Sequence, residues 1–343
     1  MTARKLRWGI ISTGKIARTF ARALAQSETG ELVSVASRTP DGVSAFAAEF
    51  AVARAHGSYE ALLADPEVEA VYIATPHPFH AQWAIAAARA KKHVLCEKPL
   101  GMNHAEVSAI VQAARENDVF LMEAFMYRCS PQTRELVRLL RSGTLGRVKG
   151  IQASFCIDGA YPVSGRVLNN ALGGGGILDI GCYPVSMARL VAGVANGESF
   201  NEPLELHALG HVGTSLVDEY TSAILKFPGE IVASLATAVQ LWQDNSVRIF
   251  GSEGRLWLRS PWHPAHEADH SEIVIERPKR EPEVIRVPSP GLLYGYEIDA
   301  VRAQLEQRQA AEMSWADSLG NALTLDRWRQ ALGVTFAADH AQA

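Results

Sequence analysis

The sequence predicts an α/β protein in which an N-terminal doubly wound parallel sheet precedes an α+β domain with a large, mainly antiparallel, open-faced sheet. Three observations predict this fold. Short apolar runs alternate with Ala-rich helical patterns early in the chain, a glycine-bearing turn lies beside the N-terminus, and many strand-like runs follow residue 150. Because 343 residues exceed one ordinary core, we expect two domains, at 1–125 and 126–343.

The N-terminal domain is predicted from β–α alternation. Apolar runs predict strands at Leu6–Ile11, Leu32–Ser37, Ala70–Ile73, Val94–Glu97 and Val119–Met122. Apolar residues three and four apart predict helices at Lys15–Gln26, Val43–Phe50, Ala81–Ala90 and Ala105–Glu116. Buried strands joined by helices form parallel sheets with right-handed crossovers, so a doubly wound sheet follows.

The second domain is predicted from a change of pattern after Arg128. A helix at Gln132–Arg141 leads into a strand at Gly150–Ile157. Further strands are expected at Glu205–His211, Tyr220–Phe227, Ile231–Ala238, Val247–Phe250, Arg255–Leu258, Glu272–Ile275 and Glu283–Val287, and helical segments at Leu292–Arg308 and Trp315–Ala331. Helices cover one face of this sheet. A second copy of the chain is the simplest cover for the other, so we expect a homodimer through this sheet, or a dimer of such dimers.

Composition favours a small-molecule partner. The 33 Lys and Arg against 37 Asp and Glu give a net charge of -4, and no basic run is interleaved with aromatic residues, which argues against a nucleic-acid partner. We expect no membrane partner, and a cytoplasmic location because the N-terminus leads directly into a strand. The four cysteines are widely spaced, which predicts reduced thiols rather than disulfides or a metal site.

The turn Trp8–Ala17 carries a dinucleotide-binding pattern. Ser12 takes the first glycine position, Gly14 permits close backbone approach, and Ala17 replaces the third glycine. A pyrophosphate would rest on the helix amides there, so the predicted contacts are Ser12, Thr13, Gly14, Lys15 and Ile16. The alternative is a turn that merely needs Gly14.

The end of the second strand bears on which dinucleotide binds. An NAD site usually has a carboxylate there, whereas this chain has Ser37 and Arg38. A hydroxyl and a guanidinium suit a 2′-phosphate, so NADP(H) is preferred over NAD(H). The alternative is an ordinary helix entry, with Thr39 as N-cap and Pro40 at the first helical position.

The strand ending at Ile73 is followed by Thr75, Pro76, His77 and His80. This edge of a parallel sheet binds ligands, so we expect these four residues to contact the cofactor. The two histidines resemble a metal pair, but no third ligand lies nearby in the sequence, so no metal is expected. His263, His266 and His270 form a second histidine group in a polar, Pro-bearing loop, which we interpret as solvated.

The segment Glu97-Lys98-Pro99 places charges at the end of an apolar strand. Pro99 fixes its own φ and biases Lys98 away from the helical region, so the backbone directs the ammonium. An ammonium pointed in this way can hold a substrate oxygen. The alternative is a strand-end lysine whose stem lies on apolar surface.

The segment Leu172–Tyr183 combines four glycines with two polar residues. The glycines would let the backbone crowd a ligand. Asp179 and Tyr183 stand four apart, so a helix through both presents them on one face. Pro184 lacks a donor, so this helix either kinks or begins late; a late start would leave only proximity.

These motifs resemble the glucose-fructose oxidoreductase / inositol dehydrogenase / MocA family, commonly called Gfo/Idh/MocA. The matching segments follow the family's order over nearly the whole length: the glycine-bearing turn, Ala74–Pro76, Glu97–Pro99, Met122–Arg128 and Gly173–Tyr183. Tyr183, where inositol dehydrogenases have histidine, is similar to the dimeric dihydrodiol dehydrogenases and NADP-dependent D-xylose dehydrogenases.

The resemblance implies hydride transfer between nicotinamide C4 and a secondary alcohol or carbonyl of a sugar, polyol or cyclic diol. Lys98 would stabilise the reacting oxygen, Tyr183 would act as acid and base, and Asp179 would orient substrate or lysine. Glu97 and Lys98 would also contact the cofactor. Candidate substrate contacts are Arg128, Tyr161 and Asn169, each with a packing role as its alternative. Trp262 is interpreted as a sheet or interface residue.

Two other functions stay open. A redox-cycling glycosidase or lyase would oxidise its substrate transiently and keep its dinucleotide bound, which Ser37 and Arg38 argue against. A dinucleotide-sensing regulator would have a dead site, which intact Lys98, Asp179 and Tyr183 argue against.

Overall fold

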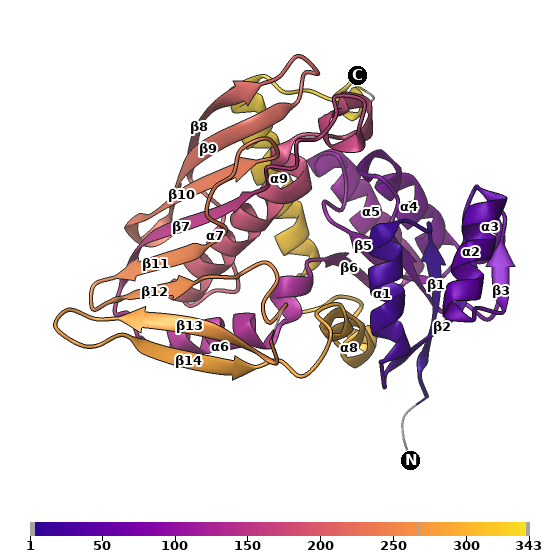
Figure 1. Cartoon of the computed structure of the whole chain (residues 1–343), viewed down its shortest axis with the longest axis horizontal. Helices are drawn as coiled ribbons and strands as arrows, with labels where there is room; N and C mark the ends of the chain where they lie inside the picture. Colours follow the sequence, from indigo (N-terminus) through magenta and orange to yellow (C-terminus); the bar gives the residue numbers. More distant parts are fainter. Residues whose placement is uncertain (1–3, 267, 341–343) are drawn as a thin grey trace. The chain divides into compact units, whose positions relative to one another are not determined.

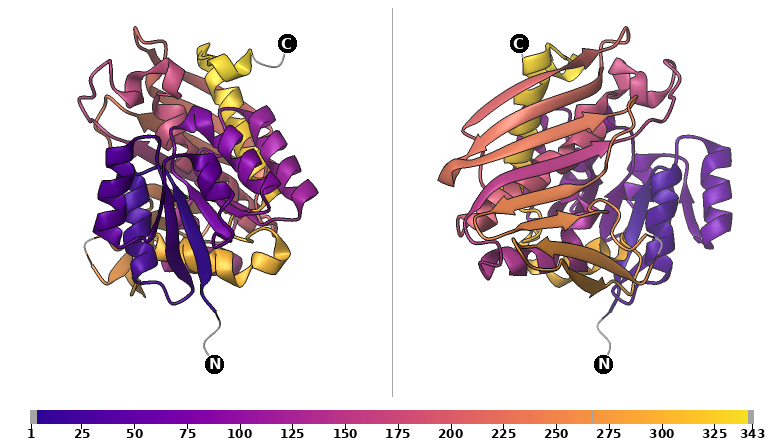
Figure 2. Two further views of the ribbon diagram at one scale, coloured as in Figure 1. Left: turned by 90° about the vertical axis from the view of Figure 1, so that its right-hand side faces the viewer. Right: turned by 60° about the vertical axis from the view of Figure 1, so that its left-hand side comes forward.

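The computed structural model describes residues 4–266 and 268–340. Its chain forms two compact units. The Rossmann unit comprises Met1–Gly101, Ala105–Cys129 and Gly291–Leu319. The open-sheet unit comprises Met102–His104, Ser130–Pro290 and Gly320–Ala343. Figures 1 and 2 show the elements of each.

The Rossmann unit is built on six parallel strands in the order β3-β2-β1-β4-β5-β6. The order reverses direction between β1 and β4, which places a ligand-binding crevice at the carboxyl ends of these strands. The doubly wound prediction is therefore confirmed. The strands are Leu6–Ile11 (β1), Gly30–Ala36 (β2), Arg54–His56 (β3), Ala70–Ile73 (β4), His93–Glu97 (β5) and Leu121–Ala124 (β6).

Helices flank this sheet. They are Lys15–Ala25 (α1), Pro40–Phe50 (α2), Tyr59–Leu63 (α3), His80–Arg89 (α4), His104–Asn117 (α5) and Gly295–Ala303 (α8). An aromatic stack in the core joins sheet and helix: the rings of Phe20 and Tyr72 lie 3.8 Å apart, and Trp8 meets Phe20 edge-on at 5.4 Å. The sequence did not predict β3 or α3, because three and five residues are too few to show a period.

The open-sheet unit contains eight strands in the order β14-β13-β12-β11-β7-β10-β9-β8. Among the residues that the structure describes, only β7 and β10 of this sheet pair in parallel, so the predicted mainly antiparallel sheet is confirmed. The strands are Val148–Cys156 (β7), Glu205–Val212 (β8), Asp218–Phe227 (β9), Ile231–Ala238 (β10), Val247–Gly251 (β11), Arg255–Leu258 (β12), His270–Glu276 (β13) and Glu283–Pro288 (β14).

One face of this sheet packs against Pro131–Arg141 (α6), Cys182–Ala195 (α7) and the part of Trp315–Leu332 (α9) from Gly320 on, while the other carries no helix (Figure 2, right). Strand β9 shows why. Ala223, Leu225 and Phe227 are buried, whereas Ser222 before them and Ile224 among them are exposed, the alternation of a half-buried strand.

Short helical segments complete the chain. A π-helical turn, Ile177–Gly181 (η5), runs directly into α7. The 3-10 segments are His77–Phe79 (η1), Met126–Cys129 (η2), Arg166–Leu168 (η3), Asn170–Leu172 (η4), Pro228–Glu230 (η6), Leu305–Gln307 (η7) and Ala337–Asp339 (η8).

The helical segment Asn170–Ala195 is long and apolar enough to cross a membrane, with a mean hydropathy of 1.4. However, 94% of its most apolar stretch is buried inside the protein, as in the core helix of a globular protein. The four cysteines are likewise buried, and none forms a disulfide.

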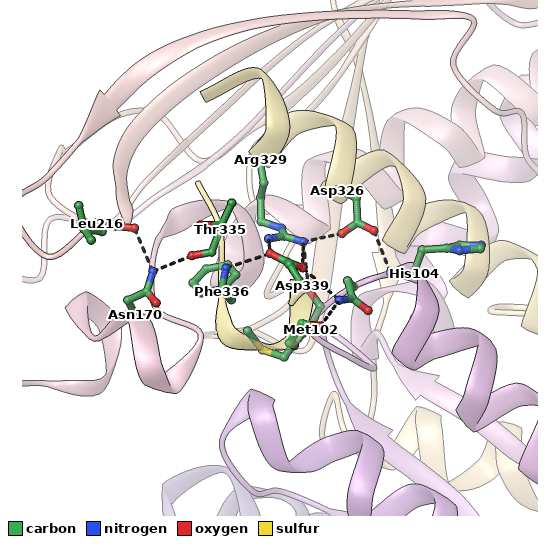
Figure 3. Close-up of polar contacts among 11 residues, drawn as sticks. Met102, His104, Asn170, Leu216, Asp326, Arg329, Thr335, Phe336 and Asp339 are labelled. Carbon is green, nitrogen blue, oxygen red and sulfur yellow. Dashed lines mark hydrogen bonds and ion pairs between the residues drawn. The ribbon is translucent and has the colours of Figure 1, made fainter. Parts of the chain in front are cut away.

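A buried arginine holds the C-terminal segment of the open-sheet unit (Figure 3). Arg329 donates to Asp326 at 2.7 Å, to Asp339 at 2.8 Å and to the Met102 carbonyl at 3.4 Å. Burial alone would raise the pKa of Asp339, but hydrogen bonds from Arg329, Asn103 and the Phe336 amide outweigh it and hold the value at about 2. The segment is thus tied to the residues just before α5.

Candidate active site

The turn after β1 is shaped for an anionic ligand. Ser12 adopts φ 94°, the left-handed region for which the dinucleotide fingerprint normally uses glycine. Gly14, the N-cap of α1, has φ -68°, and a Cβ there would meet only the Ser12 Oγ at 3.8 Å. The protein itself therefore does not require glycine at 14. No side chain caps α1, so its N-terminal amides suit a pyrophosphate.

A hydroxyl group cluster and an arginine follow β2. The Ser37 Oγ lies 3.4 Å from Thr13 Oγ1 and 3.1 Å from Thr39 Oγ1. The exposed guanidinium of Arg38 lies 5.6 Å from the centre of the Phe79 ring. These residues offer donors, and no carboxylate, at the position where a ribose or its phosphate would bind.

His80 connects two strand ends. Its ring is fully buried, with Nδ1 2.8 Å from the Pro99 carbonyl and Nε2 2.8 Å from the Thr75 carbonyl. It therefore braces the segment after β4 against the segment after β5. His77, also buried, lies 5.7 Å from His80, ring to ring. Within 4–266 and 268–340, no three His, Cys, Asp or Glu side chains are grouped to hold a metal ion.

Lys98 follows the last residue of β5 and is half-buried. Its amide donates to Glu97 at 3.3 Å, and the Tyr72 hydroxyl also donates to Glu97. The Lys98-Pro99 peptide is cis, and the Leu100 amide donates to Glu123 at 2.9 Å. A buried, hydrogen-bonded carboxylate thus stands beneath the lysine.

A second buried acid lies near this carboxylate. Glu297, in the first turn of α8, is 0% exposed, and neither of its carboxyl oxygens has a hydrogen-bond partner among the described residues. Burial, reinforced by the charge of Glu97, raises the pKa of Glu297 well above its ordinary value. The pKa values of Tyr72 and Tyr294 are raised for the same reasons. The raised pKa favours the neutral form of Glu297 beside the Glu97 carboxyl, which accepts from Tyr72.

The helix that begins in η5 carries the two candidate catalytic residues of the open-sheet unit, Asp179 and Tyr183. It runs through Asp179 and Tyr183, so the late start at Pro184 does not occur. The π-helical turn before Pro184 accommodates a residue that cannot donate. Arg166 Nη2 donates to both oxygens of Asp179, each at 3.1 Å.

Tyr183 is 3% exposed and packs against an aromatic wall. Phe155 meets its ring edge-on at 5.2 Å, and Trp262 does so at 5.8 Å. Trp262 is itself fixed by donating to the Ser154 carbonyl at 2.8 Å. No local pattern connects Phe155 or Trp262 with Tyr183, because both reach it through long-range packing. Arg166 lies in the loop from Asp158 to Asn170 that we expected to contact substrate, but its pairing with Asp179 could not be predicted from the sequence.

The glycines before this helix pack closely against other parts of the protein. A Cβ on Gly174 would lie 2.6 Å from the Val167 carbonyl, and one on Gly175 would lie 2.4 Å from Asp218. Gly174 and Gly175 therefore have a packing reason of their own, against the loop at Val167 and against Asp218 of β9, and the predicted ligand contact stays a prediction.

The remaining predicted contacts lie as follows. Arg128 is 4% exposed and forms a buried ion pair with Asp317 at 2.6 Å, so it has a packing role within the Rossmann unit. Tyr161 and Asn169 are half-buried in the loop around Arg166. His263 and His266 precede β13, whereas His270, which we expected in the same loop, is the first residue of that strand. All three line a pocket of about 610 Å³ together with Arg259 and Ser271.

Known families match both parts of the chain. The model of an oxidoreductase family with an NAD-binding Rossmann fold, GFO_IDH_MocA, matches residues 6–125, and the GFO/IDH/MocA C-terminal domain matches residues 133–257. The trans-1,2-dihydrobenzene-1,2-diol dehydrogenase of Danio rerio is 36% identical over 97% of this chain and 99% of its own. An uncharacterized oxidoreductase of Rhizobium meliloti is 38% identical over 79% of each chain.

A solved structure shares the fold. The 3-ketoreductase of Actinomadura kijaniata, in complex with NADP and TDP-benzene, has a TM-score of 0.84 and 29% identity. The alignment covers 96% of this chain and 98% of that one. The resemblance seen in the sequence motifs is confirmed.

The buried carboxyl of Glu297 predicts a pH-dependent stability. Its folded pKa lies above the unfolded value of 4.5, so the stability it contributes is present below pH 4.5 and lost as pH rises. While the folded group stays protonated, the loss is about 1.4 kcal/mol per pH unit. In the wild type the free energy of unfolding should fall between pH 5 and 8. We expect a smaller fall in Glu297→Gln, measured by urea titration at each pH. Exposed Glu306→Gln is the control and keeps the wild-type slope; an unchanged slope in Glu297→Gln would contradict the raised pKa of Glu297.

Proposed function

The chain belongs to the Gfo/Idh/MocA family of nicotinamide-dinucleotide oxidoreductases acting on sugar or diol substrates, and we propose that it is an NADP(H)-preferring dehydrogenase or reductase of CH–OH groups. The observation that best supports this proposal is the set of residues after the carboxyl ends of β1 and β2. There Gly14 leaves room that the protein does not use, and Ser37 and Arg38 stand where an NAD site has a carboxylate. The ketoreductase with the same fold was crystallised with NADP.

The reaction is hydride exchange at one carbon with proton exchange at its oxygen. The bound dinucleotide supplies or accepts the hydride at nicotinamide C4. In reduction, Tyr183 gives its hydroxyl proton to the carbonyl oxygen while Lys98 hydrogen-bonds the same oxygen and stabilises its developing charge; oxidation reverses both steps. The ketoreductase was also solved with a tyrosine changed to phenylalanine and with a lysine changed to alanine or glutamate.

Asp179 acts as an orienting group in this scheme. Its ion pair with Arg166 fixes the direction of its carboxylate, which suits an orienting role better than proton transfer. Arg166 Nη1 is buried without a partner among the described residues, so it has a donor to offer a substrate hydroxyl. Tyr161 and Asn169 in the same loop are further substrate contacts of this proposal.

The assembly in this proposal is a homodimer, in the cytoplasm, formed through the open face of the eight-stranded sheet. Small side chains occupy the centre of that face at Ser222, Ser234 and Ala236, and exposed apolar ones flank them, with Leu209 at 84% and Ile224 at 48% exposure. A flat face of this kind suits isologous packing of two sheets.

Removing the two proposed catalytic groups tests the chemistry. We expect Tyr183→Phe and Lys98→Ala each to lower kcat by about 10²- to 10⁴-fold, with unchanged affinity for the dinucleotide. Turnover is followed by NADPH absorbance, and binding by calorimetry. Exposed Lys91→Ala is the control and keeps wild-type rates. Wild-type rates in Tyr183→Phe or Lys98→Ala would remove that residue from the mechanism.

Arg38 tests the cofactor preference. Because a charged hydrogen bond to phosphate contributes about 1.5–3 kcal/mol, Arg38→Ala should raise the KM for NADPH by about 10- to 100-fold. The KM for NADH should change little. Arg22→Ala, at an exposed position of α1, is the control and should change the KM for neither NADPH nor NADH. Equal effects of Arg38→Ala on the two coenzymes would contradict the 2′-phosphate assignment.

Molar mass by light scattering tests the assembly. We expect twice the chain mass of 37.2 kDa for the wild type, and a shift toward one chain mass in Ser234→Arg, which places a charge at the centre of the face. Gln330→Arg, at an exposed position of α9, should keep the wild-type mass. A wild-type monomer, or a dimer that Ser234→Arg does not weaken, would rule out this interface.

A further inference from the structure

We propose that Asp218 is a positioning residue of the active site, because it fixes the start of the helix that presents Asp179 and Tyr183. The inference rests on the proposed function, since it assigns Asp218 a task through those two side chains. No motif in the sequence pointed to Asp218, which is the first residue of β9.

The helix lacks a cap of its own. Its N-cap residue is Gly176, which has no side chain to accept from the amides of the first turn. Asp218 supplies that acceptor from a different element: its Oδ2 accepts from the Ile177 amide at 2.7 Å. The side chain is 1% exposed, so water does not replace this contact.

The backbone before the helix is shaped around this carboxylate. Gly175 has φ 102°, and a Cβ there would lie 2.4 Å from Asp218 Oδ1. A Cβ on Gly176 would lie 3.1 Å from Asp218 Oδ2. Thr237 on β10 holds the same turn by donating to the Gly176 carbonyl at 3.2 Å. Glycine is therefore needed at both positions because a side chain there would keep the Asp218 carboxyl away from the helix N-terminus.

A charged cap is a costly choice here. Burial raises the pKa of Asp218 to about 7, although hydrogen bonds from the Ile177, Asp218 and Gly176 amides and the charge of Arg329 on α9 act in the opposite direction. A serine, threonine or asparagine would cap a structural helix without this cost. A carboxylate also interacts favourably with the positive end of the helix dipole, so it holds the first turn more firmly than a neutral cap does.

The contact lies close to the catalytic groups along the helix. Asp179 is two residues beyond Ile177 and Tyr183 is six beyond it, so a shift of the first turn moves both. Tyr183 has little freedom to compensate, because Phe155 and Trp262 confine its ring. A displacement of about 1 Å at a reacting group costs roughly 10²-fold in rate.

The test is Asp218→Asn, which keeps the shape of the side chain but removes its negative charge and one of its two acceptor oxygens. We expect kcat to fall at least tenfold while the KM for the dinucleotide stays within twofold. The ¹⁹F resonance of fluorotryptophan at position 262, identified by its loss in Trp262→Phe, should shift because that ring touches Tyr183. Ser130→Ala is the matched control: it removes the buried N-cap of α6 in the same unit and should lower stability without changing kcat or the resonance.

A double-mutant cycle separates positioning from a general structural role. Asp218→Asn should have no further effect on the residual rate of Tyr183→Phe, whereas independent structural damage would multiply the two losses. If Asp218→Asn does not fold, Thr237→Val serves in its place, with a smaller loss in the same direction. Wild-type kcat and an unshifted resonance in a folded variant, or multiplicative losses, would overturn the proposal.

The two proposals fail differently. Wild-type turnover in Tyr183→Phe would refute the proposed mechanism whatever Asp218→Asn does. An inactive Tyr183→Phe together with a fully active Asp218→Asn would refute only the positioning role.

Discussion

The parallel arrangement of six strands in the Rossmann unit is the constraint on which the rest depends. Parallel strands bring their carboxyl ends to one edge, so the segments after β1, β2, β4 and β5 meet there although about 90 residues separate the first from the last. Ser12, Ser37, Thr75 and Lys98 each directly or closely follow such an end. Helix α1 begins at the same edge and adds its uncapped amides. An anionic, elongated ligand is the natural occupant of an edge with these properties.

Buried acids recur at the points where the protein directs its polar groups. Glu97 accepts from Tyr72 and from the amide of Lys98, while burial and the charge of Glu97 raise the pKa of Glu297 nearby. Asp218 accepts from the Ile177 amide at the start of the other candidate segment. Each arrangement costs stability, because a carboxyl group leaves water without full compensation. That cost is understandable where the gain is orientation rather than stability, and it separates these acids from the exposed ion pairs elsewhere, such as Arg138 with Glu135.

Sequence reasoning succeeded where a feature is local and periodic. Apolar runs predicted the long strands of both sheets, and the family motifs predicted the segments around Gly14, Lys98 and Tyr183. It failed where an element is short or where two residues in contact lie far apart in the sequence. Strand β3 has three residues. Arg166 meets Asp179 across 13 residues, and Asp218 meets Ile177 across 41, so no local spacing announces either pair. The glycine run was visible in the sequence, but its contact with Asp218 was not, because β9 lies about 40 residues further along the chain.

The most direct test of the account is isotope transfer from the coenzyme. NADPH carrying deuterium at the transferable C4 position is incubated with the protein and a panel of ketoses, inosose-type ketones and cyclic hydroxyketones. The account predicts net coenzyme oxidation with deuterium on the new carbinol carbon of one substrate class. Glycoside cleavage without net coenzyme oxidation, or tight binding of the coenzyme with no deuterium transfer to any substrate, would contradict it.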